Sequence, residues 1–462
     1  MMGPAVFGYA IFLILLMSMI AYFVGRTSAA PFALAGGSHS RPVYHGAFAA
    51  VWVGVPALVL VLAWVLLQGP AIDRLLVATL PATLTEGVSD AQVSLYLAEI
   101  KNVAGGMMFA EPSPAIREAA ETYQRWQELA RWAMLAAAAA LTVFGLLFAS
   151  RRLSPRFRAR NNFEQVMTWL MIFCSVVAVL TTLGIVASLV FESIRFFARV
   201  PIAEFLFGLR WEPQIAIRED QIGGEGAFGA VPIFTGTLLI ATIAMFVATP
   251  IGVLTAIYLV EYADDRVRVV VKPLLEILAG IPTVVYGFFA VLVVAPAVRE
   301  SGSLFGIAIS PNSALAAGGV MGIMIIPFIS SLSDDALKAV PRAMRDGSLA
   351  MGATLGETMT RVMLPAALPG IMGGILLGVS RAIGETMIVV MAAGLIATLT
   401  FSPLDGVTTV TVQIVTLLIG DTEFDSPKTL AAFALGLVLF VVTLGLNIVA
   451  LSIVRKYREK YD

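Results

Sequence analysis

The sequence predicts an all-α membrane protein, a polytopic helical bundle with about nine transmembrane helices. Its 462 residues are 59% hydrophobic and only 13% charged, with a mean hydropathy of +0.90. A soluble domain carries about 25% charged residues, so most of this apolar surface must face lipid. Backbone amides in lipid must be satisfied within their own segment, and the predicted spans are therefore helices.

The predicted spans follow from the length of each apolar run. About 20 apolar residues cross the hydrocarbon core of a bilayer as a helix. Nine segments meet or approach this length, namely residues 5–25, 46–68, 129–149, 166–191, 231–260, 274–298, 313–333, 368–398 and 429–454.

The orientation of the spans follows from the positive charge in the short loops, which stays in the cytoplasm. Arginines cluster at residues 151–160, and alternation of the spans places the basic segments 261–273 and 334–365 and the basic C-terminal tail on the same side. We therefore expect the N-terminus outside the cytoplasm and the C-terminus inside it. The first span has no basic residues before it, and we interpret it as retained in the mature protein.

The basic segment divides the chain into two expected domains. Residues 1–160 form an N-terminal extension with three spans, a polar external loop at 69–128 and a basic cytoplasmic linker at 151–160. Residues 161–462 form a core with six spans. Within the loop, residues 115–132 have apolar positions at helical spacing, which predicts that the third span continues outward as a helix. A helix that binds the membrane surface or a partner is the alternative.

The motifs of soluble enzymes are absent from the sequence. It contains no G-x-x-x-x-G-K-[ST], so if ATP drives this protein, another chain must bind the nucleotide. It also lacks G-x-S-x-G, H-E-x-x-H and an EF-hand loop. Two histidines and a single cysteine make a zinc site improbable, and a net charge of -1 indicates no nucleic-acid partner. We therefore expect that this chain is not itself an enzyme.

The most informative motif is a predicted cytoplasmic loop with the pattern D-G-S-x3-G-x9-V-x-L-P. Its residues are Asp346, Gly347, Ser348, Gly352, Val362, Leu364 and Pro365. A glycine that ends one short helix and a proline that starts the next helix suit a docking element. The spacing is similar to the EAA loop of ABC importer permeases, E-A-A-x3-G-x9-I-x-L-P, which implies that this loop couples the chain to an ATPase. This sequence departs from that consensus in having Asp-Gly-Ser for Glu-Ala-Ala.

Three further stretches carry a more specific resemblance, namely residues 274–287, 324–341 and 378–394. With them, residues 161–462 resemble PstC-type permease subunits of bacterial phosphate ABC importers, and residues 1–150 match the longer PstC variants. The resemblance implies a six-helix core in the bacterial inner membrane that imports inorganic phosphate by alternating access. It also implies a PstA-type second permease, two ATP-binding subunits and an external phosphate-binding protein. ATP and Mg²⁺ are then expected on the ATPase, with no cofactor on this chain.

Two charges fall inside a predicted span, Arg381 and Glu385. A central arginine in a membrane helix costs about 2.5–3.5 kcal/mol on insertion scales, and intramembrane charges are functional hypotheses by default. Their i, i+4 spacing predicts that they lie on one helix face and pair. We interpret the guanidinium as a cation of the substrate pathway that meets a phosphate anion. The alternative is an ion pair that only fixes helix packing.

Small residues indicate where the helices approach closely. Glycines at 318–322 and 374–378 have small-x-x-x-small spacing, which predicts close packing of neighbouring helices. Pro250 and Pro282 are expected to kink or end their spans.

Other functions remain open from the residues alone. Arg381 would serve molybdate or sulfate as well as phosphate. A secondary transporter or channel would be expected to show related membrane repeats or a ring of pore charges, and neither is visible in the sequence. A membrane scaffold or signalling partner is the third possibility.

Overall fold

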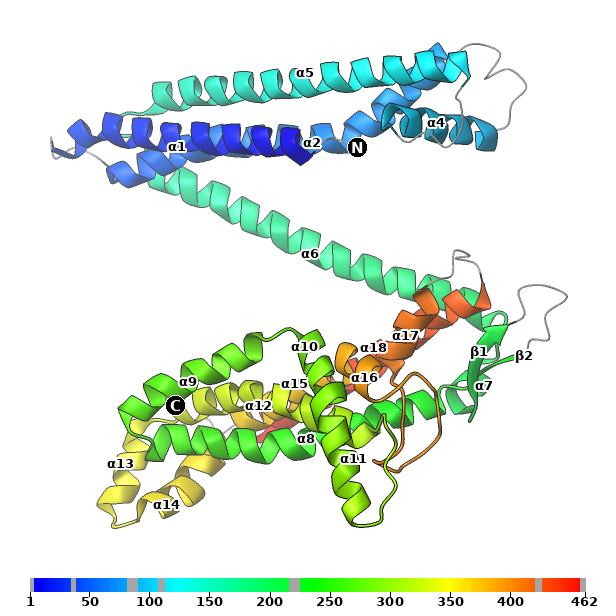
Figure 1. The fold of residues 1–462 in the computed structure, drawn as a ribbon. Helices are drawn as coiled ribbons and strands as arrows, with labels where there is room; N and C mark the ends of the chain where they lie inside the picture. The colour runs from blue at the N-terminus through cyan, green and yellow to red at the C-terminus, as the bar shows by residue number, and fades with distance from the viewer. Residues whose placement is uncertain are drawn as a thin grey trace. The chain divides into compact units, whose positions relative to one another are not determined.

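The computed structural model describes residues 4–34, 39–80, 90–106, 113–215, 225–419 and 426–457 (Figure 1). The chain folds into two compact units, Met1–Val179 and Leu180–Asp462. Each unit has cores of its own, and they are described separately below. The domain boundary expected after residue 160 stays a prediction.

Within the described residues, nine helices are long and apolar enough to cross a membrane, which confirms the predicted all-α bundle. These are Phe7–Phe32, Pro42–Thr79, Pro114–Arg152, Ala159–Phe197, Val231–Tyr262, Thr283–Leu304, Ala314–Lys338, Leu355–Ile383 and Pro427–Ser452. The segment Ala159–Phe197 is α6, which contains the boundary between the two units. Its most apolar window has no buried residue, as expected of a helix that faces lipid or a partner.

The first unit is built on three long helices, α1 (Pro4–Leu34), α2 (Pro42–Thr79) and α5 (Pro114–Arg152). They pack closely because glycines line the contacts. A Cβ added at Gly145 of α5 would lie 2.8 Å from the carbonyl oxygen of Trp52 in α2. Helices without a large apolar driving force between them associate through such close approaches.

Two of these helices extend beyond the length that a bilayer requires. At 38 and 39 residues, α2 and α5 are each about 57 Å long, whereas a hydrocarbon core is about 30 Å thick. Their extended ends enclose a separate small core with α4 (Asp90–Ala104), which includes Leu76, Ile100 and Ile116. The predicted helical continuation of the third span is confirmed, because α5 includes residues 115–132. Most of the described residues in the segment 69–128 are helical, and its position outside the cytoplasm stays a prediction.

The second unit is centred on α12, which packs against helices on two sides. The main helices are α8 (Val231–Ile257), α12 (Ala314–Lys338), α15 (Leu364–Ile383) and α18 (Pro427–Tyr457). A Cβ at Gly318 or Gly322 of α12 would lie 2.8 Å from the Cβ of Ile243 or Val247 in α8. A Cβ at Gly374 of α15 would lie 2.9 Å from a leucine of α12. The predicted close packing at both glycine pairs is confirmed.

Two predicted spans are interrupted in the structure. The run 274–298 does not form one helix, because the backbone is extended at Ile281 and Pro282. It divides into α9 (Asp265–Gly280), α10 (Thr283–Phe289), the π-helix η2 (Ala290–Val294) and α11 (Ala295–Leu304). The run 368–398 is also broken, since α15 ends at Ile383 and α16 (Met387–Ala392) is a separate short helix.

A small irregular region closes one end of the second unit (Figure 1). It contains α7 (Ile202–Phe207), α17 (Val410–Leu418) and two antiparallel strands, β1 (Trp211–Ile215) and β2 (Glu225–Phe228). In the strand register Trp211 faces Phe228. The ring nitrogen of Trp211 donates to the amide oxygen of Gln413 at 2.9 Å, which ties the hairpin to α17.

Candidate coupling loop and translocation residues

The predicted coupling loop folds as two short helices joined by a tight turn. They are α13 (Arg342–Ala350) and α14 (Leu355–Thr358), and α14 continues through the π-helix η3 (Met359–Met363) into α15. Gly352 follows α13 with φ +89°. The amide of Ala353 donates to the carbonyl of Ser348 at 3.2 Å, and that of Gly352 donates to the carbonyl of Leu349 at 3.0 Å. This is a Schellman turn, which places a left-handed residue where only glycine is free of strain.

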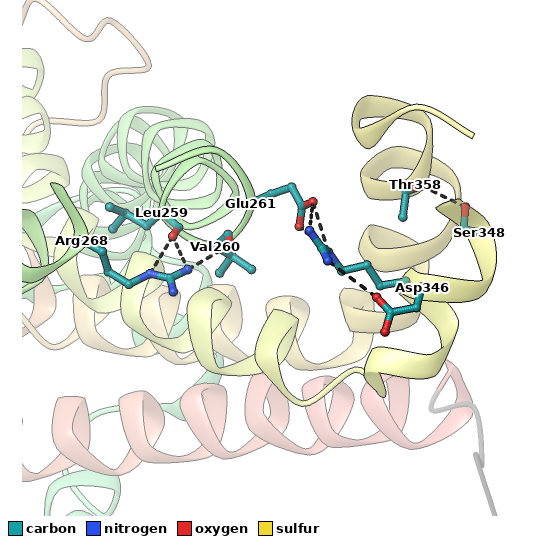
Figure 2. A network of polar contacts seen from close by, with 8 residues as sticks. Leu259, Val260, Glu261, Arg268, Asp346, Ser348 and Thr358 are labelled. Atoms are coloured by element: carbon teal, nitrogen blue, oxygen red, sulfur yellow. Dashed lines mark hydrogen bonds and ion pairs between the residues drawn. The ribbon is translucent and has the colours of Figure 1, made fainter. Parts of the chain in front are cut away.

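The second helix of the loop begins with a capping box. The hydroxyl of Thr354 accepts from the amide of Glu357 at 3.3 Å, and the Glu357 carboxylate accepts from the amide of Thr354 at 3.0 Å. The hydroxyls of Ser348 and Thr358 lie 2.9 Å apart and join α13 to α14 (Figure 2). Pro365 is the second residue of α15 and follows the π-helix η3 directly. The hairpin is therefore held by bonds internal to it.

The turn between the two helices presents apolar side chains to its surroundings. Met351 is 89% exposed and Leu355 is 43% exposed. The Asp346 side chain is 69% exposed, whereas Val362 and Leu364 are half-buried. An exposed apolar tip that is rimmed by polar residues is typical of a protein interaction site. The geometry therefore suits docking of the loop onto another protein.

The loop is anchored to the end of α8 by an ion pair that the sequence did not reveal. Arg345 of α13 forms a forked contact with Glu261, with Nε at 3.1 Å from Oε2 and Nη2 at 2.8 Å from Oε1 (Figure 2). The Glu261 side chain is only 3% exposed and belongs to the π-helix η1 (Tyr258–Tyr262), which continues α8. The hydrogen bonds to Glu261 raise the pKa of Arg345 above its usual value. The Arg345 guanidinium therefore stays charged at neutral pH.

A second arginine caps the same π-helix. Arg268 of α9 donates from its guanidinium to the carbonyl oxygens of Leu259 and Val260, with Nη2 at 2.9 Å from Val260 (Figure 2). Carbonyls at the C-terminal end of a helix have no partner within it, so Arg268 satisfies two of them. Arg345 and Arg268 thus bind neighbouring residues of η1 from two different helices.

A buried carboxylate on α12 was also missed from the sequence. The Asp334 side chain is 5% exposed and lies 3.0 Å from Lys272 of α9 and 2.5 Å from Lys338. The hydrogen bond to Asp334 raises the pKa of Lys272. A cavity of 250 Å³ lies beside this cluster, lined by residues of α9 and α12. Lys272 and Asp334 are 62 residues apart and carry no local spacing signal, whereas Lys338 follows Asp334 by four residues on the same helix.

The two intramembrane charges do not form the predicted pair. Arg381 is exposed in the last turn of α15, and Glu385 follows the end of that helix after Gly384. The buried Glu385 carboxylate accepts from the amides of Met387 at 3.0 Å and Ile388 at 3.5 Å, at the start of α16. No ion pair between Arg381 and Glu385 occurs among the described residues. The i, i+4 argument is wrong because it assumed an unbroken helix, whereas the role of both residues in transport stays a prediction.

Two family matches place this chain in the class of ABC importer permeases. Residues 11–181 match a family described as phosphate ATP-binding cassette transporter. Residues 248–459 match the family of binding-protein-dependent transport system inner membrane components.

Individual relatives agree with these family matches. The chain is 33% identical over 240 residues to the probable ABC transporter permease protein YqgH of Bacillus subtilis, covering 52% of this chain and 74% of that protein. It is 30% identical to the phosphate transport system permease protein PstC of Haemophilus influenzae, covering 63% and 90%. A chain of a solved bacterial alginate ABC transporter has a TM-score of 0.47 at 16% identity, covering 65% and 98%.

The chain therefore belongs to the PstC-type permeases, the inner membrane components of binding-protein-dependent ABC importers. Membership implies a transport subunit in the inner membrane that works with an ATPase and a substrate-binding protein.

Proposed function

We propose that this protein is the transmembrane subunit through which an ATP-driven importer moves inorganic phosphate into the cell. The observation that carries the proposal is the anchored hairpin of residues 342–358, whose tip exposes Met351 and Leu355. The chain has no P-loop of its own, so ATP and Mg²⁺ bind to a partner. Phosphate is the anion named for the PstC relatives, and molybdate or sulfate are the alternatives that a test must separate.

The assembly proposed for this importer has four other protein components. A PstA-type permease pairs with this chain, two ATP-binding subunits dock on the coupling loops, and an external binding protein delivers phosphate. The N-terminus lies outside and the C-terminus in the cytoplasm, as the basic loops indicate. ATP binding changes the energy of one conformation of the permease pair relative to the other, and that difference drives alternating access.

The substrate pathway is proposed to pass Arg381. Its guanidinium is exposed at the end of α15 and offers a planar fork of donors that matches phosphate oxygens. Glu385 lies next to this position, and its carboxylate is held at the start of α16. No ion pair joins the two side chains among the described residues, so Glu385 does not neutralise Arg381 through a direct contact.

A gentle purification of the tagged chain, followed by identification of its partners, tests the assembly. We expect an ATPase and a second permease to accompany the chain. Uptake of labelled phosphate in cells that lack other phosphate carriers should then require this chain. Recovery of the chain without any ATPase, or unchanged phosphate uptake after its deletion, would contradict the proposed function.

A further inference from the structure

Helix α9 lies between two segments of extended backbone in the second unit. None of its residues, all of which the structure describes, is buried. The backbone is extended on both sides of it, at Ala263 and Asp264 before the helix and at Ile281 and Pro282 after it. A rigid segment between two non-helical joints can move as one body, because the joints absorb the change in dihedral angles.

Three polar contacts hold α9, and Leu278 near its end also packs against the apolar core of the second unit. Arg268 binds the end of η1, and Lys272 binds Asp334 of α12 at 3.0 Å. Near the end of α9, the hydroxyl of Tyr286 donates to the carbonyl of Leu278 at 2.8 Å. The cavity of 250 Å³ separates α9 from α12 beside the lysine contact. Because no α9 residue is buried, movement of α9 exchanges these polar contacts and the packing of Leu278, and it does not disrupt a fully buried apolar interface.

The same π-helix holds both α9 and the coupling loop. Arg268 binds the carbonyls of Leu259 and Val260, and the next residue, Glu261, binds Arg345 of α13 (Figure 2). One five-residue element is thus fixed by two guanidinium groups from opposite sides. Single turns of π-helix occur frequently at functional positions in helices.

We propose that Arg345, Glu261 and Arg268 are positioning residues that transmit movement of the coupling loop to α9. In this connection, displacement of α13 moves η1 through the Arg345–Glu261 pair, and η1 moves α9 through Arg268. The Lys272–Asp334 contact forms in the conformation seen here and breaks when α9 shifts. This inference rests on the proposed function, since an ATPase must move the loop.

A purely structural role makes a different prediction. If the three residues only stabilised the fold, their loss would lower the amount of assembled importer, but each assembled complex would still couple ATP hydrolysis to uptake. A transmission role predicts normal assembly and ATP hydrolysis with less phosphate moved for each ATP. The ratio of uptake to hydrolysis therefore separates the two roles.

The test measures movement of α9 in the complete importer. Spin labels are placed in a cysteine-free background at Val269 of α9 and Phe246 of α8, which are 72% and 81% exposed. The distance between them is measured by electron spin resonance in lipid nanodiscs, with and without trapped ATP. Uptake per ATP is measured in the same preparations without labels.

We expect the distance to change on ATP trapping in the wild-type complex. Arg268→Ala should abolish this change and lower uptake per ATP by at least about fivefold. Arg266→Ala is the matched control, because it removes an exposed arginine from the same helix and should leave both measurements at wild-type values. If Arg268→Ala prevents assembly, Arg268→Lys is the second variant, because lysine keeps one donor. The proposal predicts that it shows a smaller distance change than the wild type and an intermediate uptake per ATP.

The results also separate this inference from the proposed function. A wild-type complex that imports phosphate with a constant Val269–Phe246 distance would overturn the inference alone. So would Arg268→Ala or Arg268→Lys with wild-type distance change and coupling. A wild-type chain that neither binds an ATPase nor supports phosphate uptake would overturn the proposed function itself.

Discussion

Substitution of Gly352 by alanine should loosen the coupling loop without disturbing the membrane helices. At φ +89°, a residue with a Cβ is strained by about 1–2 kcal/mol. A Cβ at this position would meet nothing within 4 Å in the described part of the chain, so the strain comes from the backbone alone. A change of this size lowers the equilibrium ratio of the native turn to other conformations by a factor of about 5–30.

Gly347 provides a matched control for the same chemical change. It lies inside α13, and a Cβ there also meets nothing within 4 Å among the described residues. Its φ is not positive, so Gly347→Ala should stabilise α13 by about 0.5–1 kcal/mol. Gly352→Asn should be milder than Gly352→Ala, because asparagine tolerates the left-handed conformation. A β-branched residue such as valine should have a larger effect.

The assay compares phosphate uptake with ATP hydrolysis at matched membrane abundance of each variant. We expect Gly352→Ala to keep hydrolysis and lose uptake per ATP, with Gly352→Asn intermediate and Gly347→Ala at or above wild type. Equal coupling in Gly352→Ala and wild type, together with reduced coupling in Gly347→Ala, would refute the reasoning about the turn.

Three further predictions concern packing, the pathway and orientation. Gly318→Leu should destabilise the second unit by about 1–3 kcal/mol through overpacking and lower its melting temperature, whereas Gly319→Leu, with open space around it among the described residues, should not. Arg381→Gln with Glu385→Gln should assemble but lose labelled phosphate uptake, with partial recovery in Arg381→Lys; near-normal uptake of the double variant would make both residues structural. Ser94→Cys in a cysteine-free background should react with a membrane-impermeant thiol reagent in intact spheroplasts, and labelling only after lysis would reverse the orientation.

Composition and spacing predicted the spans and the coupling loop because both depend on local rules. Apolar length alone decides whether a helix can cross a bilayer. Gly352 and Pro365 mark helix boundaries through their own backbone preferences. The structure accordingly places these two residues at a helix end and a helix start.

Hydropathy could not predict the interruptions within the apolar runs. The break at Pro282 confirms the expectation that this proline kinks or ends its span, which came from its backbone preference. A membrane helix tolerates either a kink or a full break at a proline, because neighbouring groups can satisfy the backbone groups that lose their helical partners. The break at Gly384 has no hydropathy signal, because a broken helix and an intact one have the same composition. The Arg381–Glu385 pair was predicted from helical spacing and failed for this reason.

Long-range polar contacts were equally invisible. Arg345 and Glu261 are 84 residues apart in sequence, and Asp334 meets Lys272 only because α9 packs beside α12. From the sequence alone, Arg345 contributes only to the positive charge of the segment 334–365, which predicts the side of the membrane on which this loop lies. Its second role depends on the fold, which brings α13 against the end of α8.

The central claim is tested most directly by transport in a defined system. The chain, a second permease, the ATPase and the binding protein are reconstituted in proteoliposomes that are supplied with ATP and with labelled phosphate, sulfate or molybdate. The account predicts ATP-dependent accumulation of phosphate that requires this chain and persists in the presence of excess sulfate. Accumulation of sulfate or molybdate in preference to phosphate, or phosphate movement without the ATPase, would contradict it.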